Sequence, residues 1–203
     1  MQKILVVIDC QNDFITGSLR NEDAIAAVPR IVEKINNFNG ERILVTQDTH
    51  NDDYLETNEG KMLPVVHCVN GSEGWQIESS IKEALDAAQQ RHIDVNYFNK
   101  PTFGSQDLVG FLCSSVGYTT YVEIEFVGFC TDICVVSNVL MVKASLYDKA
   151  KIIVDSKCCA GVTPESHQAA LTTMQMCQIH INGIETPKEY EEVNESGPSN
   201  SGE

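Results

Sequence analysis

Residues 3–9 read KILVVID, a continuous apolar run that ends at Asp9. An unbroken run of this length, rich in β-branched residues, is typical of a central strand buried on both faces of a parallel sheet, because a strand with one wet face would alternate. We therefore predict a first strand over residues 3–8, with Asp9 at its carboxyl end.

Four more apolar runs follow, and each ends at polar or reactive residues. They are RILVT at 42–46 before Asp48, IDVNYF at 93–98 before Lys100, YVEIEFVGF at 121–129 before Cys130, and KIIV at 151–154 before Asp155. Segments with helical period lie at 22–38, 81–90, 106–116, 134–149 and 164–176, and a last short strand is expected at 178–181. This alternation predicts a three-layer α/β/α domain with a doubly wound, mainly parallel sheet of about six strands.

The chain divides into one predicted domain and an acidic tail. Its 203 residues can bury the core of one ordinary domain. From Glu185 on, the chain is rich in Glu, Ser, Gly, Pro and Asn, so we predict a single domain over residues 1–184 and a disordered tail over 185–203. The segment 50–77 is long and polar, and loops of this length in a compact domain usually carry function.

Charge and hydropathy narrow the classes of partner. The net charge of -15 repels phosphate backbones and anionic lipids, which argues against nucleic acid and membranes as partners. The first apolar run is too short for a signal peptide, and later stretches fall short of the roughly 20 apolar residues of a membrane span. We expect a cytoplasmic protein that acts on a small molecule and keeps its eight cysteines as reduced thiols.

Asp9, Lys100 and Cys134 each follow the end of a predicted strand. Because the carboxyl ends of parallel strands open onto one edge of a sheet, a carboxylate, an ammonium and a thiol can meet there. Cys134 also begins a predicted helix, and the helix dipole together with Lys100 would lower its pKa into the range of about 3.5 to 7.5. Asp9 could then carry a proton from the thiol to a leaving nitrogen. Position alone favours a plainer interpretation, with Asp9 as a turn residue, Lys100 as a loop lysine and Cys134 as a core thiol.

Three separated motifs carry a family resemblance that favours the chemical interpretation. GFCTDICV at 128–135 closely resembles the nucleophile signature of the isochorismatase-like cysteine hydrolases, the superfamily that includes nicotinamidases. IDCQNDF at 8–14 looks like the strand with the family's catalytic aspartate, and KPTFGS at 100–105 looks like its lysine loop. The order of the motifs agrees over nearly the whole predicted domain. The resemblance implies an isochorismatase-like, Rossmann-like fold.

The resemblance also implies roles for individual residues. Asp9, Lys100 and Cys134 would form a catalytic triad, and a non-proline cis peptide would precede Cys130. The backbone N–H groups of Cys130 and Cys134 would form an oxyanion hole. We expect Thr131 and Asp132 to cap the following helix.

The long loop and the strand before it offer candidate metal ligands. Asp48 and His50 share one face of an extended segment, and His67 can be brought back by the loop. Such an O/N/N set with open positions suits a divalent ion, with Zn²⁺ as the first candidate and Fe²⁺ or Mn²⁺ as alternatives, although loop histidines are more often solvated. The resemblance to nicotinamidases implies that these three residues bind the ion that holds the pyridine nitrogen. Some relatives add a carboxylate, for which Glu59 is the first candidate and Glu56 the second.

The remaining cysteine and histidines near these motifs have plainer interpretations. Cys68 follows His67 but would point to the opposite face of an extended segment, so we interpret it as a packing residue. His92, His167 and His180 have no matching partners in the sequence, and we expect them to be structural or exposed.

The metal set favours nicotinamide, hydrolysed to nicotinate and ammonia, as the substrate that the resemblance implies. Phe14 and Phe103 could form apolar walls for a flat ring or be ordinary core aromatics, and Leu63 stands where many nicotinamidases carry a Trp. Trp75 lies nearby in sequence without a defined place in the pocket. Another small amide, an isochorismatase-type substrate and a catalytically silent scaffold are the alternatives. The resemblance further implies a homodimer or homotetramer.

Overall fold

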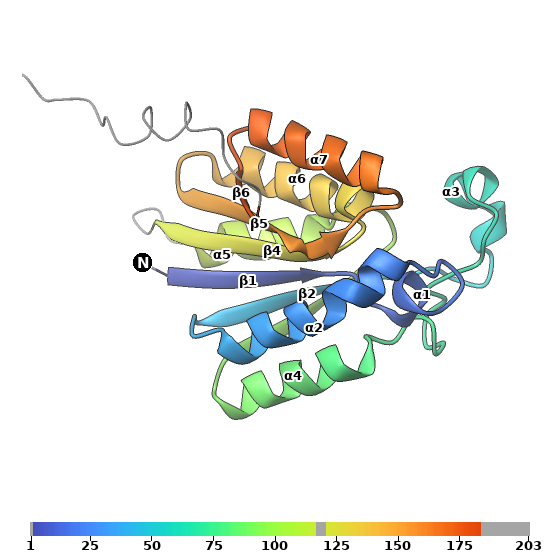
Figure 1. Cartoon of the computed structure of the whole chain (residues 1–203), viewed down its shortest axis with the longest axis horizontal. Helices are drawn as coiled ribbons and strands as arrows, with labels where there is room; N and C mark the ends of the chain where they lie inside the picture. The colour runs from blue at the N-terminus through green and yellow to red at the C-terminus, as the bar shows by residue number, and fades with distance from the viewer. Residues whose placement is uncertain (1, 117–120, 184–203) are drawn as a thin grey trace, which may run out of the picture.

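A six-stranded, all-parallel sheet forms the middle layer of the molecule in a computed structural model that describes residues 2–116 and 121–183. The strand order is β3-β2-β1-β4-β5-β6 (Figure 1). The strands are β1 Gln2–Ile8, β2 Arg42–Asp48, β3 Asp94–Lys100, β4 Val122–Phe129, β5 Ala150–Ala160 and β6 His180–Asn182. The predicted three-layer, doubly wound α/β class is confirmed. The expected tail, residues 185–203, lies outside the described residues.

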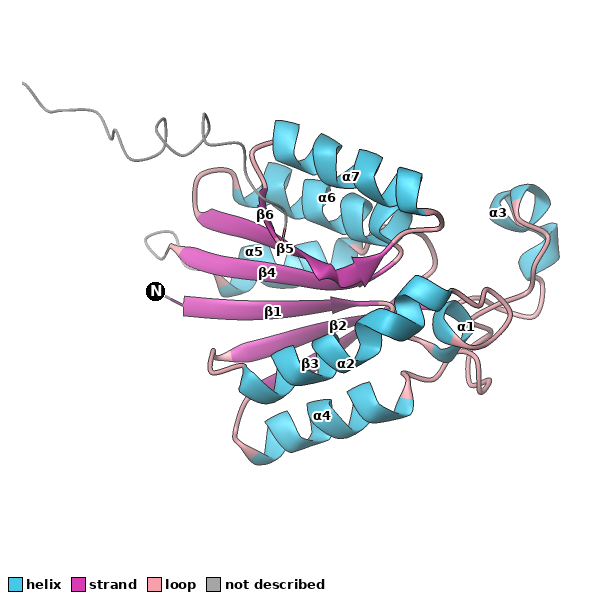
Figure 2. Cartoon of the chain, in the orientation of Figure 1, coloured by secondary structure: helices cyan, strands magenta, loops and turns pink. Residues whose placement is uncertain are grey.

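Helices cover both faces of the sheet (Figure 2). One face carries α2 (Glu22–Asn37) and α4 (Ser79–Gln90), and the other carries α5 (Gln106–Ser115), α6 (Val136–Leu146) and α7 (Pro164–Met176). In β1, Leu5 and Val7 pack toward α2 and α4, whereas Ile4 and Val6 pack toward α5, α6 and α7. Both faces of β1 are therefore buried, which explains its unbroken apolar run.

Several elements differ from their predicted bounds, most clearly β5 and the helix after β4. The strand expected to end near Asp155 continues to Ala160 as β5, because the Asp155 carboxylate pairs with Lys34 of α2 at 2.7 Å and its charge is neutralised inside the sheet. The helix expected from residue 134 begins at Thr131 with η2, a turn of π-helix over Thr131–Val135. α6 continues it.

The loop after β2 contains short helical pieces. These are η1 (Tyr54–Glu56) and α3 (Asn58–Met62), and α1 (Asn12–Ile15) follows β1. In Figure 1, α3 stands out from the layered body at the end where the strands finish. Among the described residues, none of the helices combines the length and the apolar character needed to cross a membrane.

The topology brings four strand ends to one place. β1 and β4 are neighbours, and the chain winds outward from them in opposite directions, to β2 and β3 on one side and to β5 and β6 on the other. In doubly wound sheets, ligands bind at the carboxyl ends beside such a switch point. Asp9 follows β1, Asp48 and Lys100 are paired at the ends of β2 and β3, and η2 follows β4.

Candidate active site and metal centre

Asp9, Lys100 and Cys134 come together at the switch point. The Lys100 Nζ lies 2.7 Å from Asp9 Oδ2 and 3.4 Å from Cys134 Sγ. All three side chains are buried, and only 1% of Lys100 is exposed. A buried ammonium is stable only when it is paired, so this contact holds the carboxylate and the thiol next to the same cation.

Thr46, which the sequence analysis did not single out, orients Asp9. Asp9 has a left-handed backbone conformation, with a φ of 47°, and its N–H donates to the Thr46 carbonyl at 3.2 Å. The Thr46 hydroxyl donates to Asp9 Oδ1 at 2.7 Å. One carboxylate oxygen is thus held by Thr46 and the other faces Lys100. A threonine near the end of a buried strand gives no signal of this role in the sequence.

The pKa expected for Cys134 is wrong in direction. Burial, with the neighbouring carboxylates of Asp9 and Asp48, raises the pKa of Cys134 well above its usual value despite the charge on Lys100. Burial also raises the pKa of Asp9. Burial lowers the pKa of Lys100, but the charges of Asp9, Cys134 and Asp48 together outweigh burial and raise this pKa well above its usual value. The resting site therefore favours a thiol beside a lysine cation, with Asp9 as a group that readily accepts a proton.

Cys134 is the fourth residue of η2. The N–H groups of Ile133 and Val135 donate to the Cys130 carbonyl at 3.1 and 3.0 Å, which closes the turn around the nucleophile. The peptide bond between Phe129 and Cys130 is cis, as the resemblance implied.

The capping role expected for Thr131 and Asp132 is wrong. Within the described part of the chain, η2 has no side-chain cap. Thr131 Oγ1 instead lies 2.8 Å from His167 Nδ1 of α7. The Asp132 carboxylate accepts from the N–H of Val162 at 3.0 Å, just before α7 begins. Both side chains therefore reach across to another helix, which a local capping rule does not foresee.

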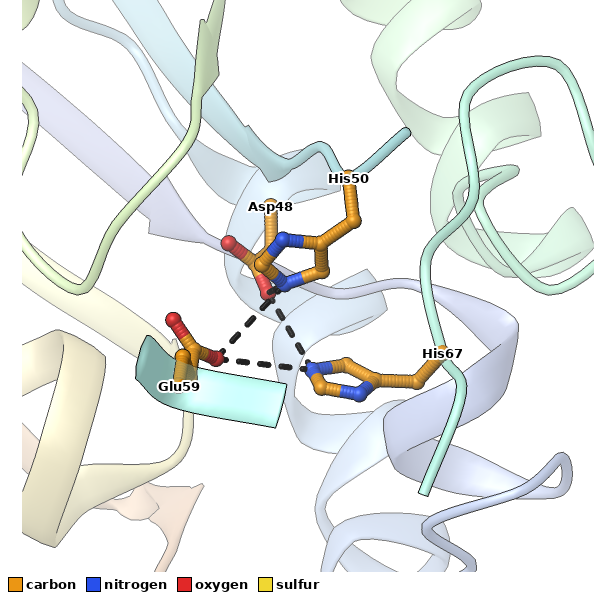
Figure 3. A group of neighbouring side chains, drawn as sticks. All are labelled: Asp48, His50, Glu59 and His67. Atoms are coloured by element: carbon orange, nitrogen blue, oxygen red, sulfur yellow. Dashed lines mark hydrogen bonds and ion pairs between the residues drawn. The ribbon is translucent and has the colours of Figure 1, made fainter. Parts of the chain in front are cut away.

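A second cluster joins Asp48, His50, Glu59 and His67 (Figure 3). One ligand atom from each residue lies within 4.8 Å of all the others. Asp48 Oδ2 is 2.9 Å from His50 Nε2 and 3.5 Å from His67 Nε2, while Glu59 Oε1 is 3.6 and 4.0 Å from the same nitrogens. Ligands about 2.1 Å from a tetrahedral metal lie about 3.4 Å apart, so these four atoms fit a divalent ion with small adjustments. Glu56, the second candidate, lies in η1 outside this cluster.

The ligands are oriented by their neighbours. His67 Nδ1 lies 2.8 Å from the Val65 carbonyl, which leaves Nε2 facing the cluster. Gln11 binds the Asp48 backbone twice, donating to its carbonyl at 2.8 Å and accepting from its N–H at 2.7 Å. The Tyr54 ring packs against both imidazoles, with centroids 4.5 Å from His50 and 4.9 Å from His67. Gln11 and Tyr54 were not predicted as site residues from the sequence, although Gln11 lies inside the motif IDCQNDF at 8–14.

The charges in this cluster are coupled. Although burial opposes it, hydrogen bonds from His50 and His67 lower the pKa of Asp48, and the charge of Lys100 adds to the effect. Burial and the Asp48 charge raise the pKa of Glu59. The cluster is thus a buried site with anionic oxygen and imidazole nitrogen donors, the chemistry of a zinc, iron or manganese site.

The three residues proposed to line a pocket have different surroundings. Phe14 is buried and meets the His67 ring edge-on at 5.6 Å. Leu63 and Phe103 are 38% and 43% exposed. Trp75 packs against the core below α2 and α4, and its Nε1 donates to Thr49 at 2.9 Å.

Cys68 is a fully buried member of the core below α2 and α4. This placement agrees with its interpretation as a packing residue. Its N–H donates to Asp13 Oδ2 at 2.7 Å, which fixes the backbone next to His67.

The protein has a three-layer α/β fold with a buried aspartate, lysine and cysteine at the switch point of its parallel sheet. Residues 3–185 match the model of the isochorismatase domain, and the chain belongs to this family.

Solved nicotinamidases share this fold. The nicotinamidase/pyrazinamidase of Bacillus subtilis is 27% identical, with a TM-score of 0.74 over 89% of this chain and 99% of that one. The Streptococcus mutans pyrazinamidase/nicotinamidase is 23% identical, with a TM-score of 0.73 and coverages of 89% and 99%. The Pyrococcus horikoshii pyrazinamidase, solved in complex with zinc, is 22% identical, with a TM-score of 0.71 and coverages of 91% and 100%. A search of curated proteins finds no match.

Proposed function

We propose that this protein is a metal-assisted cysteine amidohydrolase whose leading substrate is nicotinamide, with a linear amide C–N bond as the one that is cleaved. The observation that carries the proposal is the position of the Lys100 ammonium, 2.7 Å from the Asp9 carboxylate and 3.4 Å from the Cys134 sulfur. The metal-type cluster around Asp48 lies directly beside it, because Asp48 Oδ1 is 3.2 Å from the same ammonium.

The first half of the reaction is acyl transfer to sulfur. Cys134 Sγ attacks the carboxamide carbon while Asp9 takes the thiol proton, and the backbone N–H groups of Cys130 and Cys134 receive the oxyanion. The C–N bond then breaks, and Asp9 delivers its proton to the departing ammonia. Lys100 keeps its charge throughout and holds the side chains of Asp9 and Cys134 close to each other.

The second half releases the acid. Asp9 takes a proton from water as the water oxygen attacks the thioester carbon. The C–S bond breaks, the proton returns to sulfur, and the carboxylic acid leaves. The raised pKa of Asp9 suits it to this alternation between base and acid.

The Asp48, His50, Glu59 and His67 donors would hold one divalent ion, with zinc as the first candidate and iron or manganese as alternatives. When bound, the ion supplies a Lewis acid that can hold the nitrogen of a heteroaromatic ring. The zinc found with the Pyrococcus horikoshii pyrazinamidase supports this choice.

Two observations make nicotinamide the leading candidate among amides. They are the metal-type cluster around Asp48 and the likeness to the Bacillus subtilis enzyme. Phe14 beside His67 offers an apolar wall for a flat ring, and Leu63 and Phe103 would complete the pocket from its exposed side. Another small amide or an isochorismatase-type substrate is the alternative.

The test measures ammonia release from nicotinamide, pyrazinamide and simple aliphatic amides. We expect activity that depends on the ring and that disappears in Cys134→Ala, while Cys177→Ala, which changes an exposed thiol, keeps wild-type turnover. Undiminished ammonia release by Cys134→Ala would contradict the assignment of Cys134 as the nucleophile.

Elemental analysis of wild type and His50→Ala tests the metal separately. A homodimer or homotetramer, also proposed, is tested by light scattering.

A further inference from the structure

The turn that contains Cys134, η2, is attached to α7 by the side chains of its first two residues, Thr131 and Asp132. Thr131 begins η2 and lies three residues before Cys134. Its hydroxyl is fully buried and lies 2.8 Å from His167 Nδ1. Asp132, the next residue, contacts Ser166 and accepts from the N–H of Val162. The turn therefore has two side-chain attachments to one neighbouring helix.

The start of α7 is a firm point of attachment. Thr163 and Ser166 form a capping box at its N-terminus, with Pro164 in the first turn. The preceding Gly161 is held by Asn21, whose amide donates to the Gly161 carbonyl at 2.7 Å. A Cβ on Gly161 would lie 2.8 Å from the Cβ of His167, so the backbone and His167 are packed closely. α7 is thereby fixed to the start of α2 as well as to the sheet.

The geometry points to His167 as a positioning residue of the nucleophile: its contact with Thr131 holds the beginning of η2, so that Cys134 stays within reach of Lys100. We infer this from the short path along the turn from Thr131 to Cys134. The inference rests on the proposed role of Cys134. His167 acts through Thr131 and touches neither the substrate nor the reacting atoms.

The Thr131 contact is the attachment that matters for position. Thr131 is fully buried, whereas Asp132 is partly exposed and its carboxylate satisfies the backbone at the start of α7. A buried hydroxyl that loses its partner must find another one, and the backbone around it shifts to do so. A shift of this kind at the start of η2 is passed along the turn to the sulfur.

Two substitutions of His167 separate the hydrogen bond from the bulk of the side chain. Asn places a polar atom near the position of Nδ1, whereas Leu fills the space without one. We expect His167→Leu to lower kcat about 10- to 100-fold with unchanged KM and metal content, because small misplacements of a nucleophile have effects of this size. His167→Asn should stay within about threefold of wild type. Thr131→Val should match His167→Leu, and the double variant should be no worse than either single one.

Hydrogen exchange of the η2 backbone gives a readout that does not depend on turnover. Exchange at residues 131–135 should rise in His167→Leu and stay at the wild-type level in His167→Asn, with the sheet unaffected. Unchanged exchange in His167→Leu, or equal kcat losses in the Leu and Asn variants, would overturn the positioning role. A wild type that hydrolyses no amide would refute the proposed function. The hydrogen-exchange comparison would then still test whether His167 holds the beginning of η2.

Discussion

Asp48 belongs to both halves of the site at once. Its Oδ1 lies 3.2 Å from the Lys100 ammonium, while its Oδ2 faces the imidazoles of His50 and His67. Lys100 is almost fully buried, so two carboxylates, Asp9 and Asp48, share the neutralisation of one cation. Asp48 would therefore link a bound metal ion directly to Lys100, whose ammonium also contacts the Cys134 sulfur.

Tyr54 is expected to set the metal affinity of the cluster. Its fully buried ring packs on both histidine ligands, and its hydroxyl donates to the Leu63 carbonyl at 3.0 Å. Tyr54→Leu should weaken zinc binding roughly 10-fold, because residues that orient metal ligands typically contribute that much. Tyr54→Phe keeps the ring and should bind zinc nearly as wild type, while losing about 1 kcal/mol of stability with the hydrogen bond.

Competition against a chelating dye measures the zinc affinity, and urea unfolding of the metal-free proteins measures the stability. Equal losses of zinc affinity in the two Tyr54 variants would assign the effect to the hydroxyl. Wild-type affinity in Tyr54→Leu would show that the aromatic contacts do not orient the ligands.

Gly128 is required by the close approach of β4 to β1. Its φ is +119°, and an added Cβ would lie 2.0 Å from the Ile8 carbonyl oxygen, a backbone atom of the neighbouring strand. Gly128→Ala should destabilise the protein by more than about 3 kcal/mol or prevent folding. Gly110→Ala is the matched control, because a Cβ there meets nothing within 4 Å. Because Gly110 lies in the interior of α5, Gly110→Ala should raise the free energy of unfolding by roughly 0.5–1 kcal/mol, as measured by urea unfolding. A mild effect at Gly128 would contradict the geometry.

At the residue scale, the sequence predicted which groups meet but not their chemical state. Asp9, Lys100 and Cys134 could be placed together because parallel strands share one edge for their carboxyl ends. The raised pKa of Cys134 could not be predicted, because it depends on complete burial and on two carboxylates brought in by other strands. The partner of Thr131 was equally hidden, since His167 lies in a helix later in the chain.

At the element scale, errors arose where a tertiary contact overrides a local pattern. β5 continues through Asp155 because Lys34 from α2 pairs with it. The bounds of α7, by contrast, matched the predicted 164–176, because Thr163 and Pro164 are strong local start signals. Local signals therefore sufficed for α7. They failed for β5, whose Asp155 has a distant partner, and for the helix predicted at 134–149, which begins at Thr131 with η2 and ends at Leu146.

Lys34 joins α2 to the sheet, and its contribution should depend on pH. Its Nζ lies 2.7 Å from both Glu125 of β4 and Asp155 of β5, and its side chain lines an open pocket of about 470 Å³. Burial opposes the charge, but the hydrogen bonds to Asp155 and Glu125 raise the pKa of Lys34 above its ordinary 10.5. A raised pKa of a base means that its stabilising effect is complete below 10.5 and is lost as the pH rises through the folded-state value.

Lys34→Met should therefore lower the free energy of unfolding by about 1–2 kcal/mol at pH 7, and the difference from wild type should shrink as the pH rises above 10.5. Urea unfolding at several pH values measures both quantities. Lys82→Met removes an exposed pair with Asp86 within α4 and should change stability by less than about 0.5 kcal/mol. A difference for Lys34→Met that stays constant into the alkaline range would show that the loss comes from packing.

At the scale of the whole molecule, the order of the strands could not be predicted from the sequence. Alternating strands and helices predicted a parallel, doubly wound sheet, and the apolar run of residues 3–8 predicted a central position for β1. Which strand lies on the other side of β1 depends on where the chain reverses its direction of winding, and β4 takes that place. This reversal puts Cys134 opposite Asp9, so the choice of neighbour creates the site.

The segment 185–203 is expected to be dispensable for folding. It contains six glutamates and one lysine, so it carries five of the fifteen net negative charges, and its composition offers almost nothing to a core. Deletion of residues 185–203 should leave turnover unchanged and shift the Tm by less than about 2 °C, upward at low salt because self-repulsion falls. A deletion that begins at residue 178 should instead be strongly destabilised, because it also removes the buried Ile179 and the pairing of β6 with β5. Thermal unfolding at 20 and 200 mM salt compares the two deletions, because the Debye length is about threefold longer at the lower concentration and charges are screened less there. A loss of more than about 5 °C from the shorter deletion would mean that the acidic segment contributes packing that its composition does not predict, and the domain boundary would then lie beyond residue 184.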